Sequence, residues 1–154
     1  KANVLYNYVA DNLNYISYIA EASGALTTLE KKEGDCTDYS DLFLALTRAS
    51  GIPSRFLEGI TYTPGKSELE DIKHDWTEIY LPNTGWTPAD PTWGKHKDKR
   101  HKYFSQTDGN HIIITRGRNL KTLNDRHYFA YDYWWEGNRA NVTFKEGWEI
   151  LPID

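Results

Sequence analysis

Pro53 separates two kinds of sequence pattern in this chain, and that division limits the folds open to it. Before Pro53 the apolar residues recur every three or four positions, as they do on one face of an α-helix. After Pro53 the chain has short apolar and β-branched runs between turn residues, which is typical of strands. Helices followed by strands, without regular alternation, predict an α+β fold with N-terminal helices packed on an antiparallel β-sheet.

Two helices are expected ahead of the only cysteine. In residues 3–20 the apolar side chains are spaced by three and four, which predicts an amphipathic helix over the whole segment. Ala25–Lys32 predicts a shorter helix, with Leu26 and Leu29 turned toward the core. Both helices would bury one apolar face against the later sheet.

The third predicted helix begins at the cysteine itself. Asp35 is a favourable N-cap residue, and the helix is expected to run to about Ser50 before Gly51 closes it. Cys36 is in line with Tyr39 on the apolar stripe. The sequence therefore predicts that Cys36 lies in the first turn, on the face that meets the core.

The second part of the chain predicts an antiparallel sheet. Residues 82–85, Pro-Asn-Thr-Gly, have turn composition and predict a hairpin between the strands on either side. The 154 residues contain no repeat, low-complexity tract or linker, so one domain over residues 1–154 is expected. The predicted strands are Arg55–Tyr62, His74–Leu81, Trp86–Asp90, Ile112–Thr115, Arg126–Trp135 and Val142–Ile150.

Composition excludes several classes of function. A formal net charge of −4 argues against binding of nucleic acid through bulk electrostatics. A single cysteine excludes an internal disulfide and a zinc site built from several thiolates. No apolar run is long enough to span a membrane. The chain contains no Met and no signal peptide, so we interpret it as a domain of a larger protein.

Cys36, His74 and Asp90 supply a thiol, an imidazole and a carboxylate, the parts of a cysteine nucleophile with its base and its orienting group. The N-terminus of a helix favours thiolate through its unpaired N–H groups and partial positive charge. The same N–H groups can stabilise the oxyanion of a tetrahedral intermediate. These three residues are the candidate catalytic residues.

Each of the three also has an ordinary structural interpretation. A lone cysteine on an apolar helix face is commonly a packing residue, and a histidine at a strand start is commonly a hydrogen-bonded structural residue. Asp90 precedes Pro91, a pair that often initiates a turn. Composition and spacing alone leave the catalytic and the structural interpretations open.

The sequence around these residues resembles the transglutaminase-like superfamily. Residues 34–56 are similar to its nucleophile segment, a Gly-x-Cys that opens a helix ending in Arg-Ala-x-Gly-Ile-Pro-x-Arg. Residues 74–80 resemble its His-x-Trp-x-Glu strand, and residues 85–92 resemble its Gly-Trp and Asp-Pro-Thr strand, in the family's order. The resemblance implies a papain-like fold with Cys36 as nucleophile, His74 as base and Asp90 as third member.

Two features depart from the family pattern. Family members often supply an oxyanion donor from a Trp or Gln upstream of the cysteine, whereas here every Trp and the only Gln lie downstream. Asn14, Tyr15 and Tyr18 are the candidate substitutes. In addition, a plain hairpin pairs Leu81 with Trp86, which leaves His74 three residues, or about 10 Å, from the position opposite Asp90.

That offset predicts an irregularity in the hairpin. A β-bulge or a wider connection, expected near Pro88, would have to bring His74 and Asp90 together. Trp76 and Trp86, together with Tyr15, are candidates for lining a substrate cleft, although core packing is the favoured alternative for the two tryptophans.

The expected function is that of a cysteine enzyme that forms a thioester with a peptide or carboxamide carbonyl of a protein or peptide substrate. Hydrolysis is favoured over cross-linking, because the chain lacks the accessory domains and the acidic calcium loop of large cross-linking relatives. A non-catalytic module that binds a peptide or glycan is the alternative from another class. No cofactor is expected. No metal is expected either, since the other histidines, His96, His101, His111 and His127, show no metal-ligand spacing.

Two surface features carry smaller expectations. Residues 95–102 hold five lysines and arginines, which we interpret as a solvated loop rather than as a site for an anionic substrate or cell-surface polymer. Residues 141–143 match a glycosylation sequon, which matters only in an exported protein. An extracellular or cell-surface location is favoured over a cytoplasmic one.

Overall fold

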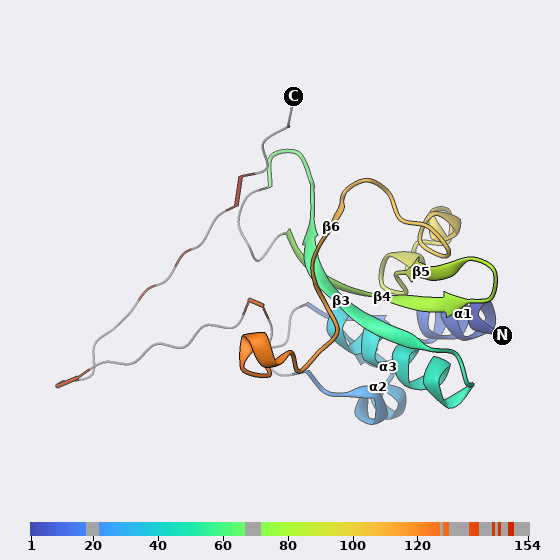
Figure 1. Ribbon diagram of the computed structural model, residues 1–154, viewed down its shortest axis with the longest axis horizontal. Coiled ribbons are helices and arrows are strands. Elements are labelled where there is room, and N and C mark those ends of the chain that lie inside the picture. The colour runs from blue at the N-terminus through green and yellow to red at the C-terminus, as the bar shows by residue number, and fades with distance from the viewer. Residues whose placement is uncertain are drawn as a thin grey trace.

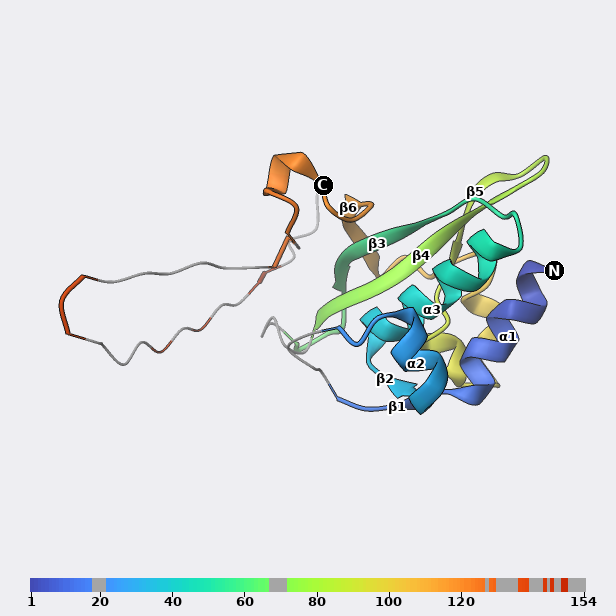
Figure 2. The ribbon, with the colours of Figure 1, turned by 90° about the horizontal axis from the view of Figure 1, so that it is seen from below.

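The computed structural model describes residues 1–17, 22–66, 72–126, 128–129, 136–138, 143, 145 and 148–149. Within these residues the three α-helices lie together on one side of a four-stranded antiparallel sheet (Figures 1 and 2). This arrangement confirms the α+β plan predicted from the sequence.

The three α-helices form the layer that covers the sheet. They are α1 (Ala2–Asn12), α2 (Ala25–Lys31) and α3 (Cys36–Ala49). The α3 helix packs directly against the two middle strands, and α1 and α2 pack against α3. None of the helices in the described residues is long and apolar enough to cross a membrane.

The first helix is much shorter than the sequence pattern predicts, so a helix to residue 20 is wrong. It ends at Asn12, and Leu13 is extended, with φ −101° and ψ 142°. The Asn14 N–H then donates to the carbonyl of Lys32 at 2.8 Å. Strand β1 (Asn14–Tyr15) pairs in parallel with β2 (Glu33–Gly34). Backbone hydrogen bonds to a distant segment thus replace the helical ones.

The second and third helices start where the sequence predicts, but one residue of the second helix faces solvent and not the core. Leu29 packs against the core, but Leu26 is 69% exposed, so the prediction that it faces inward is wrong. Asp35 caps α3, and Gly51, with φ +77°, follows its end. The Asp35 side chain accepts from two N–H groups of the first turn, which confirms the predicted cap.

Four of the six predicted strands are present within one or two residues of their expected bounds. The predicted strands at 126–135 and 142–150 lie mostly outside the described residues. The sheet has the order β5-β4-β3-β6, and every neighbouring pair is antiparallel. Its strands are β3 (Ser54–Thr61), β4 (Lys73–Leu81), β5 (Gly85–Ala89) and β6 (His111–Arg116).

The β4–β5 hairpin has a different register from the one expected. Leu81 pairs with Gly85, which has φ +82°, and the ladder continues without a shift to Thr77 and Ala89. The irregularity predicted near Pro88 is therefore wrong, because the change of register occurs in the turn. As a result, Asp90 follows the strand at the level of Trp76.

The main core lies between α1, α3 and the sheet. It contains the completely buried side chains of Tyr6, Val9, Tyr39, Phe43 and Ile79. The Tyr39 hydroxyl donates to the Leu13 carbonyl at 2.7 Å, which ties the end of α1 to α3. Because α3 is the central element of this core, its first residue is held rigidly relative to β4.

Residues 95–102 are mostly exposed, as expected of a solvated segment, but they are not without regular structure. The segment begins at the end of one short 3-10 helix, η1 (Trp93–Lys95), and includes a second, η2 (Arg100–Lys102), and a third, η3 (Lys121–Leu123), follows β6. Arg100 forms two hydrogen bonds with Asp11, at 3.0 and 2.7 Å, so at least one of these cations is engaged by α1.

Candidate active site

Cys36 is the first residue of α3 and is half-buried, so it lies at the boundary between the core and the surface. The Asp35 cap engages the N–H groups of Thr37 and Asp38, at 2.9 and 3.3 Å. The N–H of Cys36 itself is not among the groups engaged by this cap. The thiol therefore lies where the helix supplies partial positive charge and a backbone donor.

Gly34 allows the chain to enter α3 at close range. An added Cβ at Gly34 would lie 2.4 Å from the Cβ of Asp38. Asp38 is completely buried, accepts from the Asp35 N–H at 3.3 Å, and also accepts from the Ser23 N–H at 2.9 Å. The glycine before Asp-Cys thus has a steric reason, independent of catalysis.

Strand β4 is fastened to the start of α3 through Asp75. The Thr37 hydroxyl donates to the Asp75 carboxylate at 2.6 Å, and the Ser40 hydroxyl donates to the Asp75 carbonyl at 3.2 Å. His74, the preceding residue, is thereby held beside Cys36. A hydrogen bond and the charge of Cys36 both contribute to the pKa of the His74 ring.

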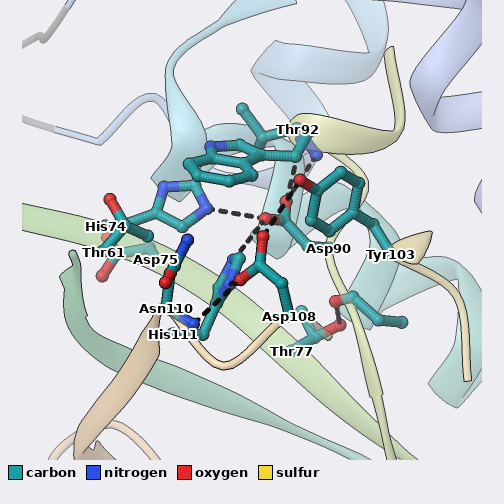
Figure 3. A network of polar contacts seen from close by, with 12 residues as sticks. Thr61, His74, Asp75, Thr77, Asp90, Thr92, Tyr103, Asp108, Asn110 and His111 are labelled. Atoms are coloured by element: carbon teal, nitrogen blue, oxygen red, sulfur yellow. Dashed lines mark hydrogen bonds and ion pairs between the residues drawn. The ribbon is translucent and has the colours of Figure 1, made fainter. Parts of the chain in front are cut away.

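His74 and Asp90 are in direct contact, as Figure 3 shows. The Nε2 atom of His74 lies 2.8 Å from Oδ2 of Asp90. The other carboxylate oxygen, Oδ1, accepts the N–H groups of Thr92 and Trp93, at 2.9 and 3.0 Å. Since Cys36 also interacts with the His74 ring, Cys36, His74 and Asp90 lie in one group, with the imidazole between the other two.

The two buried groups hold each other in their charged forms. Burial by itself would lower the pKa of His74, but the charge and hydrogen bond of Asp90, with those of Cys36, raise the pKa well above its ordinary value. Burial would raise the pKa of Asp90, whereas the charges and hydrogen bonds of His74 and His111 lower it. Each group therefore favours the charged form of the other.

His111 is a member of this group that the sequence analysis did not find. Its Nε2 atom lies 3.2 Å from the same Asp90 oxygen, and its Nδ1 atom lies 2.8 Å from Oδ1 of Asp108 (Figure 3). The ring is 1% exposed. Only the position of β6 beside β3 brings this residue to Asp90, so no local pattern could have indicated it.

Aromatic rings surround the two histidines. Trp76 is 1% exposed and stacks on His74, with ring centres 5.7 Å apart. Trp93, three residues after Asp90, also lies against both histidines, at 5.6 Å from His74 and 4.9 Å from His111. Trp76 therefore supports the site from within the core, and Trp93 is a further neighbour that the sequence analysis did not identify.

A glycine in β3 makes room for this packing. Gly59 pairs with His74, and an added Cβ would lie 2.9 Å from Cη2 of Trp76 and 2.1 Å from the Ile112 carbonyl oxygen. Because Gly59 has no side chain, the indole of Trp76 can lie over β3. Its ring centre is 5.1 Å from that of His111, and the two rings meet edge to face.

The other residues that the sequence proposed for the site are Asn14, Tyr15, Tyr18 and Trp86. Tyr15 is a half-exposed residue of β1. Burial makes the largest contribution to raising the pKa of its hydroxyl, and the charges of Cys36 and Asp35 raise it further, so Tyr15 lies near the thiol. Asn14 lies next to Tyr15 in β1, and Tyr18 lies outside the described residues. Trp86 lies at the other end of β5 from Asp90, 42% exposed and beneath the guanidinium of Arg55 at 4.1 Å.

In the described part of the chain, one group has the composition of a metal site. One donor atom each from His74, Asp90 and His111 lies within 4.8 Å of the others. These atoms are already within hydrogen-bond distance through the shared Asp90 oxygen, so the group is engaged as a proton network. That the chain uses no cofactor or metal stays a prediction.

Comparison with known proteins agrees with the geometry. The model of the transglutaminase-like superfamily matches residues 1–91. The chain is 34% identical over 77 residues to the uncharacterized protein YebA of Bacillus subtilis, covering 42% of this chain and 10% of YebA. It is 28% identical over 142 residues to an uncharacterized protein of Mycobacterium tuberculosis, covering 86% of this chain and 40% of that protein.

A solved structure shares the fold. A crystal structure of a candidate cysteine protease from Cytophaga hutchinsonii matches with a TM-score of 0.55 and 23% identity, over 75% of this chain and 35% of that chain. This chain thus spans well under two thirds of the length of each of these proteins.

Proposed function

Since this chain belongs to the transglutaminase-like superfamily, we propose that it is the catalytic region of a cysteine enzyme that cleaves peptide or carboxamide bonds. One observation carries the proposal: Cys36 begins a capped helix beside His74, while the far nitrogen of His74 lies 2.8 Å from buried Asp90. Because Nε2 of His74 faces Asp90, Nδ1 is the nitrogen left for the thiol.

In the first half-reaction, the Cys36 thiolate attacks the carbonyl carbon and a carbon–sulfur bond forms. The tetrahedral intermediate collapses, the carbon–nitrogen bond breaks, and the His74 imidazolium gives its Nδ1 proton to the leaving amine. The products are a thioester on Cys36, a neutral His74 and a free amine.

In the second half-reaction, neutral His74 takes a proton from water as the water oxygen attacks the thioester carbonyl. A carbon–oxygen bond forms, the carbon–sulfur bond breaks, and the carboxylic acid leaves. The Cys36 thiolate and the His74 imidazolium are restored. Asp90 keeps Nε2 protonated throughout, so that Nδ1 is the nitrogen that exchanges protons.

The oxyanion of each tetrahedral intermediate needs donors beside the thiol. The N–H of Cys36, which the Asp35 cap does not engage, is the first candidate. Tyr15 is the second candidate, because it lies near enough to Cys36 for their charges to interact. Its hydroxyl would replace the upstream Trp or Gln that other family members use.

Hydrolysis is the favoured outcome of the proposed reaction, in agreement with the candidate cysteine protease that shares the fold. A lysine amine in place of water would convert the same thioester into a cross-link, because the first half-reaction is identical. A folded domain whose Cys36 is an ordinary thiol would instead act as a binding module for peptides or glycans.

Two measurements test the proposal. The first is the rate of Cys36 alkylation by iodoacetamide across pH, which is clean because the chain has one cysteine. We expect reactivity well below pH 8.5 that is lost in His74→Ala, whereas reactivity that rises only near about pH 8.5 would contradict an activated thiol. The second offers a glutamine peptide with and without a primary amine, so that ammonia release without amine incorporation identifies hydrolysis.

A further inference from the structure

The hydrogen bonds of Asp90 account for every acceptor position of its carboxylate. Two backbone N–H groups donate to Oδ1, and the Nε2 atoms of His74 and His111 both contact Oδ2. An ionised carboxylate offers about four such positions. Since Asp90 is completely buried, water cannot replace a missing donor, and His111 occupies the last position.

His111 is itself held from the opposite side. Its Nδ1 atom lies 2.8 Å from Oδ1 of Asp108, whose other oxygen accepts the Tyr103 hydroxyl at 3.2 Å. Burial would raise the pKa of Asp108, but its hydrogen bond to His111 lowers it, so this carboxylate is ionised. An ionised carboxylate only accepts hydrogen bonds.

Both nitrogens of the His111 ring therefore face acceptors. The two hydrogen bonds, to Asp90 and to Asp108, form together only when both nitrogens carry hydrogen, as they do in the imidazolium form. The groups that face this ring and can carry charge are His74, with ring centres 5.7 Å apart, Tyr103 at 5.9 Å, and the two carboxylates.

We propose that His111, oriented by Asp108, is a positioning residue that fixes the Asp90 carboxylate for His74 and shares its negative charge with that ring. This inference rests on the proposed function and extends it to a residue outside the three sequence motifs. His111 does not touch the substrate; it acts through Asp90. A carboxylate oxygen shared by two rings holds His74 less tightly, which leaves the His74 proton easier to transfer.

The test uses three variants of the whole chain. His111→Phe keeps a ring but removes both hydrogen bonds and the charge, and His111→Gln keeps one donor toward Asp90 without charge. His96→Gln, at an exposed histidine, is the matched control. Circular dichroism and thermal melts establish that each variant is folded.

Peptide-amide cleavage measures the positioning role. We expect His111→Phe to lower the rate about ten- to a hundredfold, as the loss of an outer hydrogen-bond partner typically does. His111→Gln should recover part of this loss, and His96→Gln should match the wild type. A folded His111→Phe variant with the wild-type rate would overturn the proposal.

NMR titration of the histidine rings separates this inference from the proposed reaction. We expect two ring N–H signals from His111 in the wild type, and a His74 ring that releases its proton at higher pH in His111→Phe, because the Asp90 oxygen then interacts with His74 alone. If the wild type cleaves nothing, the proposed function fails and these signals still decide the role of His111. A single His111 N–H signal, or an unchanged His74 titration in a folded variant, would refute it.

Discussion

His74 Nε2 lies 2.8 Å from Asp90 Oδ2, although the strand register puts Asp90 level with Trp76 and not with His74. The contact is diagonal: His74 and Trp76 are two residues apart and share one face of β4, so a side chain just beyond the end of β5 can reach either. Asp90 is directed toward His74 by the two backbone N–H groups that hold its other oxygen.

The first prediction concerns the charge of Asp90. In Asp90→Asn the neutral amide no longer stabilises the His74 imidazolium, so the pKa of His74 should fall toward its ordinary value. The thiolate–imidazolium pair then becomes less populated, so Cys36 alkylation near neutral pH should slow at least tenfold. Iodoacetamide kinetics across pH measure this, with exposed Asp98→Asn as the control. Equal profiles for the two variants would contradict a role for Asp90.

The second prediction concerns stability and pH. The pKa of His74 is raised on folding, so its stabilisation is present below about pH 6.5 and is lost as pH rises through the folded pKa. The pKa of Asp90 is lowered, so its stabilisation is present above about pH 3.9 and is lost as pH falls through the folded pKa. The pair therefore stabilises most between these two pH values.

Urea unfolding of the wild type and of Asp90→Asn measures this window. The difference between their free energies of unfolding should be largest at weakly acidic pH and should shrink as the solution becomes alkaline. Taking the difference removes the contributions of titrating groups that do not contact Asp90. A difference that grows steadily toward alkaline pH would show that His74 is not the partner of Asp90.

The third prediction concerns Gly34. Alanine at this position puts a Cβ 2.4 Å from the Cβ of buried Asp38, and the capping turn must move to accept it. We expect a loss of about 1–3 kcal/mol in the free energy of unfolding, as for other overpacked sites. Gly109→Ala is the matched control, since nothing lies within 4 Å of the added atom. Chemical denaturation of both variants decides whether Gly34 is required for steric reasons.

The fourth prediction concerns the oxyanion donor. If the Tyr15 hydroxyl stabilises the tetrahedral intermediate, Tyr15→Phe should slow peptide-amide cleavage by about 10²–10³. Alkylation of Cys36 by iodoacetamide forms no oxyanion and should remain at the wild-type rate. Tyr8→Phe, at another partly exposed tyrosine of the N-terminal segment, serves as the control. Loss of both reactions in Tyr15→Phe would show that Tyr15 supports the position of Cys36 instead.

Local interactions explain which features could be predicted from the sequence. The cap at Asp35, the helix that begins at Cys36 and the four strands of the sheet depend on neighbours within a few residues, so local patterns indicate them correctly. The order of the three motifs likewise identified the family. The end of the first helix at Asn12 could not be predicted, because backbone bonds to residues 32–34 compete with the helix there.

The sequence by itself determined the α+β plan, the place of the thiol at a helix start and the set of three residues proposed for catalysis. Only the tertiary structure decided how His74 meets Asp90, because a change of one residue in the hairpin turn alters every pairing along the strands. It also decided that His111 and Asp108 complete the group, since β6 reaches the site by pairing with β3, which lies fifty or more residues earlier in the chain. Contacts between such distant segments leave no periodic or compositional pattern in the chain.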